Sequence, residues 1–237
     1  MIMSSCSNHN TLSIGHRGAK GYVAENTLES INKAIELGVD GIEIDIFKCL
    51  SNELVLFHDK DLDKLTGKPG QIENLTLKEL QEFLVLGKYK IPTLKDVLIK
   101  IEKPLFVNIE LKGLDTAEAT SKIIRDYSKN TSWSLENFIV SSFNWNELEQ
   151  FRSIDKNTPI GVLVSKSMSI NEAIEFGKKI DAQAIHPNYT LLDEKTVKKI
   201  KNNGFKIYTW TVNNKDDINY IKKLKVDGII SDYPDRI

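Results

Sequence analysis

The amino-acid sequence predicts an α/β protein, folded as a closed (β/α)8 TIM barrel with a small inserted subdomain after the second strand. Short apolar runs rich in β-branched residues recur along the chain, and segments with helical periodicity separate most of them, which is typical of a parallel sheet. Eight of these runs can be parallel strands, and eight strands close such a barrel. An open doubly wound sheet is the alternative, but no GxGxxG or Walker-type glycine loop follows the first run.

The eight predicted strands are short and apolar, as expected of strands that are buried in a barrel wall. They cover residues 12–18, 41–47, 105–111, 138–143, 159–164, 182–187, 206–212 and 227–232.

Helices are predicted between the strands. In residues 26–38, NTLESINKAIELG, Asn26 is expected to cap the helix, Glu29 to complete a capping-box pair, and Gly38 to end the helix. The same pattern predicts helices at 76–84, 93–101, 116–128, 169–180, 193–204 and 214–224.

A ninth apolar run, LVLFHD at 54–59, follows the second strand too closely for a crossover, so we expect an antiparallel hairpin. The stretch from about 59 to 90 is longer than a barrel loop requires and is rich in turn residues. We therefore predict one barrel domain over residues 1–237, with the hairpin and insertion at 48–90 inside it.

Composition excludes several classes of protein. The 32 basic and 33 acidic residues give a net charge of −1, which argues against a nucleic-acid partner. No apolar run is long enough for a membrane-spanning helix, and the first ten residues lack both a basic and an apolar region. We therefore expect a cytoplasmic protein without stable membrane insertion. Cys6 and Cys49 match no metal-ligand spacing and are expected to be reduced.

Acidic side chains on the second and third strands predict a metal site. Glu43 and Asp45 alternate with isoleucines, so both carboxylates share one face of the strand and point into the barrel. Glu110 ends the third strand, just before Lys112. Internal salt bridges are one interpretation. The other is a hard divalent cation, Mg²⁺ or Ca²⁺, since the three acids offer only oxygen ligands.

Counting formal charges favours the metal. The carboxylates of Glu43, Asp45 and Glu110 together with Arg17, at the end of the first strand, and Lys112 sum to −1. One divalent cation changes this sum to +1, and a bound phosphodiester of charge −1 makes the site neutral. The charges therefore suit a metal together with a singly charged phosphate ester.

Two histidines lie where they can act as acid and base. His16 ends the first strand and His58 ends the hairpin extension, and a histidine pair at the mouth of a barrel can exchange protons near neutral pH. Asp59 is expected either to orient an imidazole or to cap a turn. His186, at the end of the sixth strand, is expected to have no role in the chemistry.

Aromatic residues at the strand ends are candidates for lining the pocket. Trp210 ends the seventh strand and offers an apolar surface with one N–H donor, although a packed aromatic is an equally good interpretation. Phe143 and Tyr189 are weaker candidates.

Several segments resemble the glycerophosphodiester phosphodiesterase family from about residue 13 to 235. They are GHRGAKGYVAENTLESINKAIELGVDGIEIDI, LVLFHDKDLDKLTG, IPTLKDVL, NIELK, SSFN and YTWTVNNKDDINYIKKLKVDGIISDYPD. The resemblance implies a (β/α)8 barrel with an inserted subdomain, a divalent metal, and hydrolysis of a small glycerophosphodiester to glycerol 3-phosphate and an alcohol. The site residues it implies are His16 and His58 as acid and base, Glu43, Asp45 and Glu110 as metal ligands, and Arg17 and Lys112 as phosphate-binding residues.

The chain departs from the family at two turns. Ala24 stands where the family often has Pro, and CLSNE replaces the usual hairpin turn built on Asp-Gly. Both changes leave the reactive groups in place and affect the expected substrate preference more than the chemistry.

Two other functions fit the same residues. One is a metal-free lyase that forms a Schiff base through Lys112, although three nearby carboxylates would keep that lysine charged. The other is a barrel that binds phosphate esters without turning them over.

Overall fold

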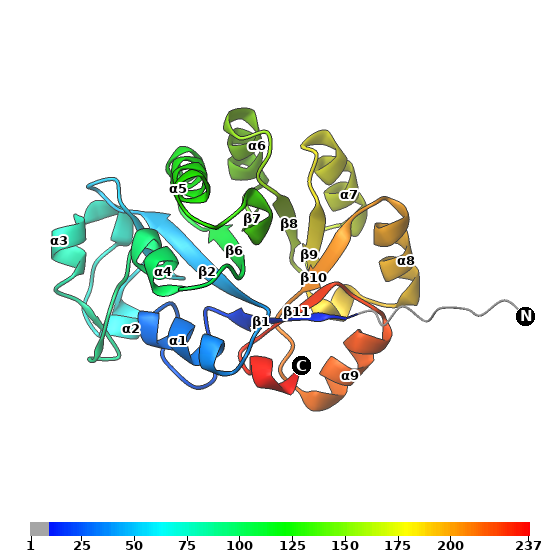
Figure 1. The fold of residues 1–237 in the computed structure, drawn as a ribbon, viewed down its shortest axis with the longest axis horizontal. Helices are drawn as coiled ribbons and strands as arrows, with labels where there is room; N and C mark the ends of the chain where they lie inside the picture. Colours follow the sequence, from blue (N-terminus) through cyan, green and yellow to red (C-terminus); the bar gives the residue numbers. More distant parts are fainter. Residues whose placement is uncertain (1–9) are drawn as a thin grey trace, which may run out of the picture.

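The computed structural model describes residues 10–237, in which eight parallel strands form a closed ring (Figure 1). The strand nearest the start of the chain, β1 (Leu12–His16), pairs with β2 (Gly41–Lys48) on one side and with the last strand, β11 (Gly228–Ser231), on the other. The ring continues through β6 (Phe106–Leu111), β7 (Phe138–Ser142), β8 (Ile160–Val164), β9 (Ala184–Pro187) and β10 (Lys206–Thr209). The predicted closed barrel is confirmed, and the open sheet is excluded because β1 pairs with both β2 and β11.

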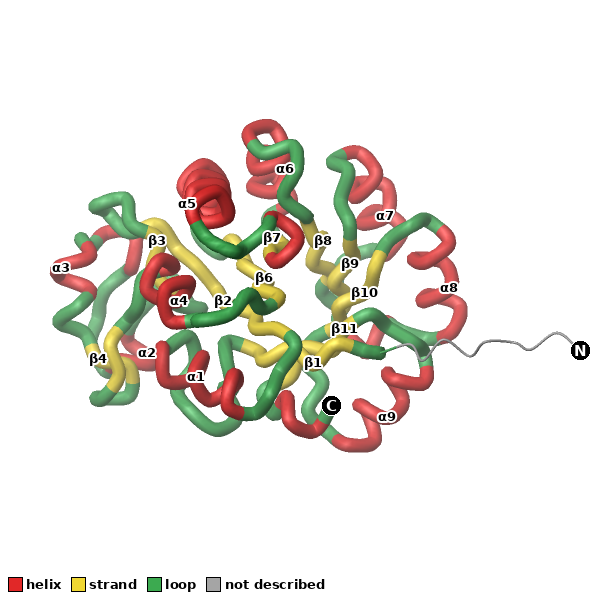
Figure 2. The backbone as a smooth tube through the Cα atoms, in the orientation of Figure 1, coloured by secondary structure: helices red, strands yellow, loops and turns green. Residues whose placement is uncertain are grey.

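Helices form an outer ring around the strands (Figure 2). They are α1 (Leu28–Glu36), α4 (Leu94–Lys100), α5 (Ala117–Asn130), α6 (Trp145–Ile154), α7 (Ile170–Lys179), α8 (Glu194–Asn202) and α9 (Lys215–Lys223). Single 3-10 turns lie at Ile72–Asn74, Leu135–Asn137, Tyr189–Leu191 and Pro234–Arg236. No helix within residues 10–237 has both the length and the apolar character needed to cross a membrane.

The helix α6 was not predicted from the sequence. Its buried face contains the charged residues Glu147 and Arg152 beside Leu148 and Phe151. Arg152 donates hydrogen bonds to the backbone carbonyls of several residues, Ile180 among them. Because half of the buried face is ionisable, the apolar periodicity that reveals the other helices is weak here.

Along β2, successive side chains point to opposite faces of the barrel wall. Ile42, Ile44 and Ile46 are fully buried in the large core between the strands and the helices. Glu43 and Asp45 face the inside of the barrel. The inside is closed below them by a smaller apolar cluster of Ile14, Ile139, Ala184, Tyr208 and Ile230.

The start of α1 differs from the prediction. Thr27, rather than Asn26, is the N-cap, and its hydroxyl accepts a hydrogen bond from the Ser30 backbone N–H at 3.1 Å. Thr27 has the extended backbone that an N-cap requires, whereas Asn26 has a left-handed φ of 56°. The side chain of Asn26 turns toward Asp45 instead.

The insertion packs beside the barrel around its own small core (Figure 1). The hairpin strand β3 (Leu54–Leu56) runs antiparallel to the end of β2. The insertion then forms α2 (Asp63–Thr66), α3 (Leu77–Leu80), β4 (Leu84–Val85) and β5 (Tyr89–Lys90). The helix expected at 76–84 is thus shorter, because the chain enters β4 at Leu84. Cys49 is buried in this core as a free thiol, while Cys6 lies outside the described residues.

His186 lies inside the barrel. It is fully buried, and its ring fills the space that a side chain at Gly161 would occupy. Neither ring nitrogen has a hydrogen-bond partner. Burial lowers the pKa of His186 to about 3. The ring is therefore uncharged in the folded protein, and its unpaired nitrogens cost stability.

Replacing His186 with Leu is expected to remove an acid sensitivity of the fold. With a native pKa of about 3 and an ordinary value in the unfolded chain, the unfolded state binds an extra proton as pH falls below about 6.5. Wild-type stability should then fall by roughly 1 kcal/mol per pH unit more than that of His186→Leu between about pH 6 and 4. Urea unfolding of both proteins at neutral and acid pH measures the difference. Equal slopes would show that the imidazole takes up its proton over the same pH range in the folded and the unfolded protein, and would contradict the low pKa.

Candidate active site

The predicted site residues gather at the carboxyl ends of the barrel strands around a cavity of about 100 Å³. All of them line this cavity except Asp45, which is 1% exposed, and the weaker candidate Tyr189. The lining residues are His16, Arg17, Glu43, His58, Asn108, Glu110, Lys112, Phe143, Leu163, Trp210, Thr211 and Ile230. The insertion contributes His58, and the remaining side chains come from the barrel strands and the residues directly after them.

Three carboxylates form a tight, buried cluster. Asp45 on β2 is in register with Glu110 on β6, and Glu43 lies one inward position earlier on β2. Their ligand atoms lie within 4.8 Å of one another, and within residues 10–237 this is the one such group with the composition of a metal site. Burial and the charge of Asp45 raise the pKa of Glu43 well above its usual range and raise the pKa of Glu110 to about 7. Without a cation these carboxylates repel one another, so the cluster has the electrostatics of a cation site.

The donor set fits a hard divalent cation. Every ligand atom is a carboxylate oxygen, the type that Mg²⁺ and Ca²⁺ prefer. Asp45 Oδ1 is also buried without a hydrogen-bond partner, which is costly for an anionic oxygen unless a ligand contacts it.

Two positively charged side chains, Arg17 and Lys112, flank the carboxylate cluster. The Arg17 backbone N–H donates to Glu43 Oε2 at 2.9 Å, and Arg17 Nε lies 3.1 Å from Asp45 Oδ2 as an ion pair. Lys112 Nζ lies 3.0 Å from Glu110 Oε1 and 3.9 Å from Asp45 Oδ1. Burial opposes the charge on both groups, but the adjacent carboxylates prevail and raise the pKa of Arg17 and of Lys112. Both side chains therefore carry full positive charge at the cavity.

Glu25 is a site residue that sequence reasoning missed. It lies 2.5 Å from Arg17 Nη1 and 3.2 Å from Lys20 Nζ, and these two cations outweigh its burial and lower the pKa of Glu25. Its charge is offset by Lys20, so the formal charge counted for the site is unchanged by the pair. A Glu eight residues after the Arg gives no local signal, because the loop that brings them together is irregular.

Each histidine is held by a carboxylate behind it. His16 Nδ1 lies 2.6 Å from Asp232 Oδ1, and His58 Nδ1 lies 2.6 Å from Asp59 Oδ1. Asp59 thus orients an imidazole, which decides between the two roles that the sequence left open. Burial is the main cause that lowers the pKa of His16 and of His58, so both rings favour the neutral form.

The carboxylates also set which nitrogen faces the cavity. A neutral imidazole that donates its Nδ1–H to a carboxylate keeps its Nε2 lone pair free to accept a proton. At His58 this lone pair is within reach of Lys112 Nζ, at 3.2 Å. His16 Nε2 lies 3.9 Å from Glu43 Oε2. Asp232 was missed because it follows the last strand, 216 residues after its partner. Its position at a strand end was the one available signal.

The aromatic residues form one wall of the cavity. Phe143 and Trp210 pack edge to face, with ring centroids 5.2 Å apart, and Lys112 Nζ lies 5.9 Å from the Phe143 centroid. The indole N–H of Trp210 donates to the His186 carbonyl at 2.8 Å. The ring of Trp210 therefore lines the cavity, while its only donor is used by a hydrogen bond to the barrel backbone. Tyr189 is not among the lining residues, and its hydroxyl contacts Asp217 at 3.3 Å.

Two larger hollows lie outside the cavity. A cleft of about 720 Å³ shares His58 and Lys112 with the cavity and continues over the insertion past Lys60, Lys64 and Glu73.

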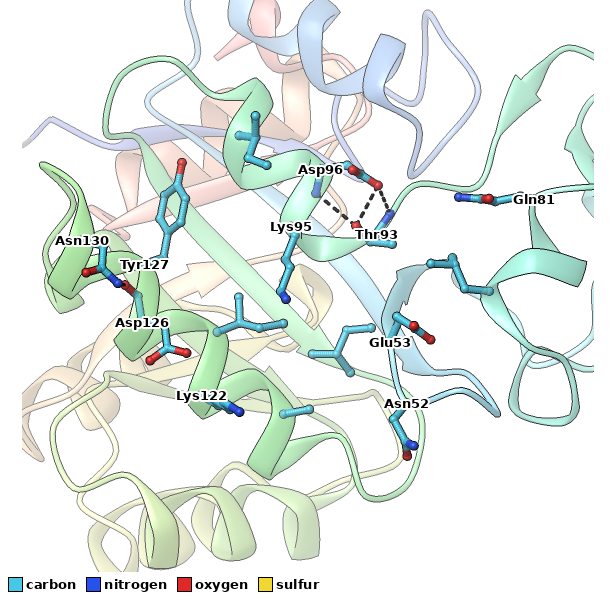
Figure 3. Close-up of a pocket in the computed structure, with 15 residues that line it drawn as sticks. Asn52, Glu53, Gln81, Thr93, Lys95, Asp96, Lys122, Asp126, Tyr127 and Asn130 are labelled. Atoms are coloured by element: carbon cyan, nitrogen blue, oxygen red, sulfur yellow. Dashed lines mark hydrogen bonds between the residues drawn. The ribbon is translucent and has the colours of Figure 1, made fainter.

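The other hollow, of about 770 Å³, lies on the outer wall between α4, α5 and the turn of the hairpin (Figure 3). In this view Lys95 lies between Tyr127 on one side and Glu53 on the other, and Thr93 and Asp96 are joined by the capping bonds of α4. None of the predicted site residues lines it, and it lacks the buried charges found inside the barrel.

Known proteins resemble the chain over nearly its whole length. A glycerophosphodiester phosphodiesterase of Caldanaerobacter subterraneus is 33% identical over 242 residues, with 96% of each chain covered. The crystal structure of a glycerophosphodiester phosphodiesterase from Thermotoga maritima is 31% identical and superposes with a TM-score of 0.81, covering 96% of this chain and 97% of that one.

A third relative is an Oleispira antarctica phosphodiesterase in complex with the product sn-glycerol-3-phosphate. It is 27% identical, with a TM-score of 0.83 and 94% of each chain covered. Residues 16–236 match the glycerophosphoryl diester phosphodiesterase family. Since this match spans both histidines, the carboxylate cluster and the last strand, the chain belongs to the glycerophosphoryl diester phosphodiesterase family and is a phosphodiester hydrolase.

Proposed function

We propose that the protein hydrolyses glycerophosphodiesters to glycerol 3-phosphate and an alcohol, with a divalent cation held by Glu43, Asp45 and Glu110. The observation that carries the proposal is that the carboxylate cluster, the positively charged side chains of Arg17 and Lys112, and two imidazoles, each backed by a carboxylate, meet at one cavity. The product bound to the Oleispira antarctica relative supports the glycerol phosphate half of the substrate.

Arg17 and Lys112 are proposed to bind the phosphate. Both carry charge at the cavity and are held by carboxylates that fix their positions. As a nucleophile adds to phosphorus, negative charge builds on the phosphoryl oxygens, and preorganised cations stabilise that charge more than they stabilise the ground state. The wall formed by Phe143 and Trp210 is proposed to pack against the carbon atoms of the glycerol.

The first step is proposed to be intramolecular. The glycerol hydroxyl next to the phosphate attacks phosphorus and loses its proton to one imidazole, and the bond to the alcohol breaks as the other imidazole, in its protonated form, gives a proton to the leaving oxygen. The product of this step is a cyclic phosphate. Water then opens the ring with the two histidines exchanging roles, which restores both protons and yields glycerol 3-phosphate.

A divalent cation bound by the cluster would act as a Lewis acid on the phosphate oxygens and lower the pKa of an oxygen nucleophile. The charge at the site is consistent with this. Asp232 adds one negative charge to the sum predicted from the sequence, and a protonated His16 beside it would offset that charge.

Chelation is expected to abolish activity and to destabilise the fold. A cation that binds only the native state stabilises it, and its removal leaves three buried carboxylates in mutual repulsion. The test is product analysis over a panel of glycerophosphodiesters, with and without EDTA, together with the melting temperature of the metal-free and metal-loaded protein. Full activity of protein shown to be metal-free would contradict the role of the cation.

Borohydride trapping and the same panel of glycerophosphodiesters separate the two rival functions. A Schiff-base lyase would be trapped by borohydride with a carbonyl substrate, but Glu110 and Asp45 raise the pKa of Lys112 against burial and so disfavour the uncharged amine that this chemistry needs. A binding protein would retain the diesters unchanged. The panel also identifies the preferred alcohol and shows whether lysophospholipids are accepted.

A further inference from the structure

Asn26 lies in the loop that leads from β1 to α1, directly before the N-cap residue Thr27. Its side chain is buried, with 2% exposure, and its backbone φ of 56° is in the left-handed region. Asn adopts this conformation more readily than most residues. Because Thr27 caps α1, the amide of Asn26 is not used by the helix.

The amide of Asn26 binds Asp45 twice. Asn26 Nδ2 donates to Asp45 Oδ2 at 2.9 Å, and the Asp45 backbone N–H donates to Asn26 Oδ1 at 3.2 Å. One planar group therefore contacts both the carboxylate and the main chain of the same residue. This fixes the rotation of the carboxylate relative to β2.

The two oxygens of Asp45 consequently differ. Oδ2 accepts from Asn26 and lies 3.1 Å from Arg17 Nε, which does not form a hydrogen bond with it. Oδ1 is buried without a hydrogen-bond partner and belongs to the cluster with Glu43 and Glu110. Without the amide, only the ion pairs with Arg17 and, at 3.9 Å, with Lys112 would hold the carboxylate, and ion pairs fix its rotation less well than two directed hydrogen bonds.

We propose that Asn26 is a positioning residue: it fixes the Asp45 carboxylate so that Oδ1 faces the cation site, and thereby sets the affinity for a divalent cation. The inference rests on the cation binding proposed above and adds a residue that does not itself contact the cation. Groups that hold a metal ligand from behind typically change metal affinity by roughly 10- to 100-fold.

The test is a calorimetric titration of metal-free protein with Mg²⁺ and with Ca²⁺. Asn26→Gly keeps the left-handed backbone at no steric cost and removes the side chain that makes both hydrogen bonds. Asn52→Gly is the matched control, because Asn52 also has a left-handed φ, of 74°, but is exposed in the turn between β2 and β3. We expect Asn26→Gly to raise the Kd for the cation by roughly 10- to 100-fold and Asn52→Gly to leave it unchanged.

A second variant tests the same hydrogen bond without deleting the side chain. Asn26→Asp keeps the shape of the side chain but places a carboxylate against Asp45 Oδ2, so it should also weaken cation binding. The cation concentration for half-maximal activity should rise by the same factor as the Kd in each variant. A merely structural role would instead lower the melting temperature of the metal-free protein and leave the Kd unchanged.

Wild-type cation affinity in both Asn26 variants would overturn the positioning role while leaving the proposed function intact. If wild-type protein bound neither Mg²⁺ nor Ca²⁺, the cation itself would be wrong, and the inference would fail with it. The titration of the wild type distinguishes these two failures.

Discussion

A substrate that lacks the glycerol hydroxyl next to the phosphate is expected to turn over at least about a thousandfold more slowly than its parent, a loss of roughly 4 kcal/mol of transition-state stabilisation. A hydroxyl held next to phosphorus reacts intramolecularly, for which effective molarities of about 10⁵ to 10⁸ M are possible. A diester of 2-deoxyglycerol phosphate is the suitable probe, because it keeps the phosphate, the charge and the leaving alcohol.

The deoxy compound should still bind. Arg17 and Lys112 are proposed to contact the phosphate rather than the missing hydroxyl, so we expect competitive inhibition with a constant close to the KM of the parent. Steady-state kinetics with both compounds gives the two numbers. Hydrolysis of the deoxy diester at a rate near that of the parent would mean that water attacks directly, and the cyclic intermediate would then be abandoned.

Replacing His16 or His58 with Ala is expected to lower kcat by about 10² to 10⁴. Each Nε2 faces the cavity and each Nδ1 is held by a carboxylate, so the loss removes a proton carrier and not only a contact. Both side chains lie at the edge of the barrel, where packing contributes little, and the fold should survive. The measurements are kcat with the preferred diester and the melting temperature.

His186→Leu is the control for both histidine variants, since it removes a more deeply buried imidazole whose nitrogens contact nothing in the cavity. It should keep near-wild-type turnover. An Ala variant of His16 or His58 with wild-type kcat would remove that histidine from the mechanism.

Most of the fold was predictable because barrel strands and helices differ in period. The alternation of Glu43 and Asp45 with isoleucines placed two carboxylates inside the barrel from the sequence alone, and their cluster with Glu110 followed from strand order. The helix α6 was missed because Arg152 and Glu147 occupy its buried face. Hydrogen bonds with backbone groups and with the Thr116 hydroxyl satisfy these two residues only in the folded chain, so apolar spacing does not reveal them.

The site was predictable where chemistry lies on strand ends and not where it depends on long-range partners. Asp232 and Glu25 hold His16 and Arg17, but nothing in their local sequence indicates which side chain they meet. Asn26 is a different case, because its residue type suggests a role that it does not have. Its residue type suits a helix cap, yet a left-handed backbone turns it to Asp45, and backbone conformation at one residue is beyond what a short pattern specifies.

The pairing of β1 with β11 joins the first and last strands of the barrel, and it also places Asp232 against His16. All other proposed catalytic, cation-binding and phosphate-binding residues precede residue 113, so a growing chain carries most of the reactive groups long before it can close. During synthesis, His16 acquires its partner only when the final strand has left the ribosome and docked. The enzyme is therefore expected to become competent in a single late event, and fragments ending before β11 should be inert toward phosphodiesters even where they retain structure.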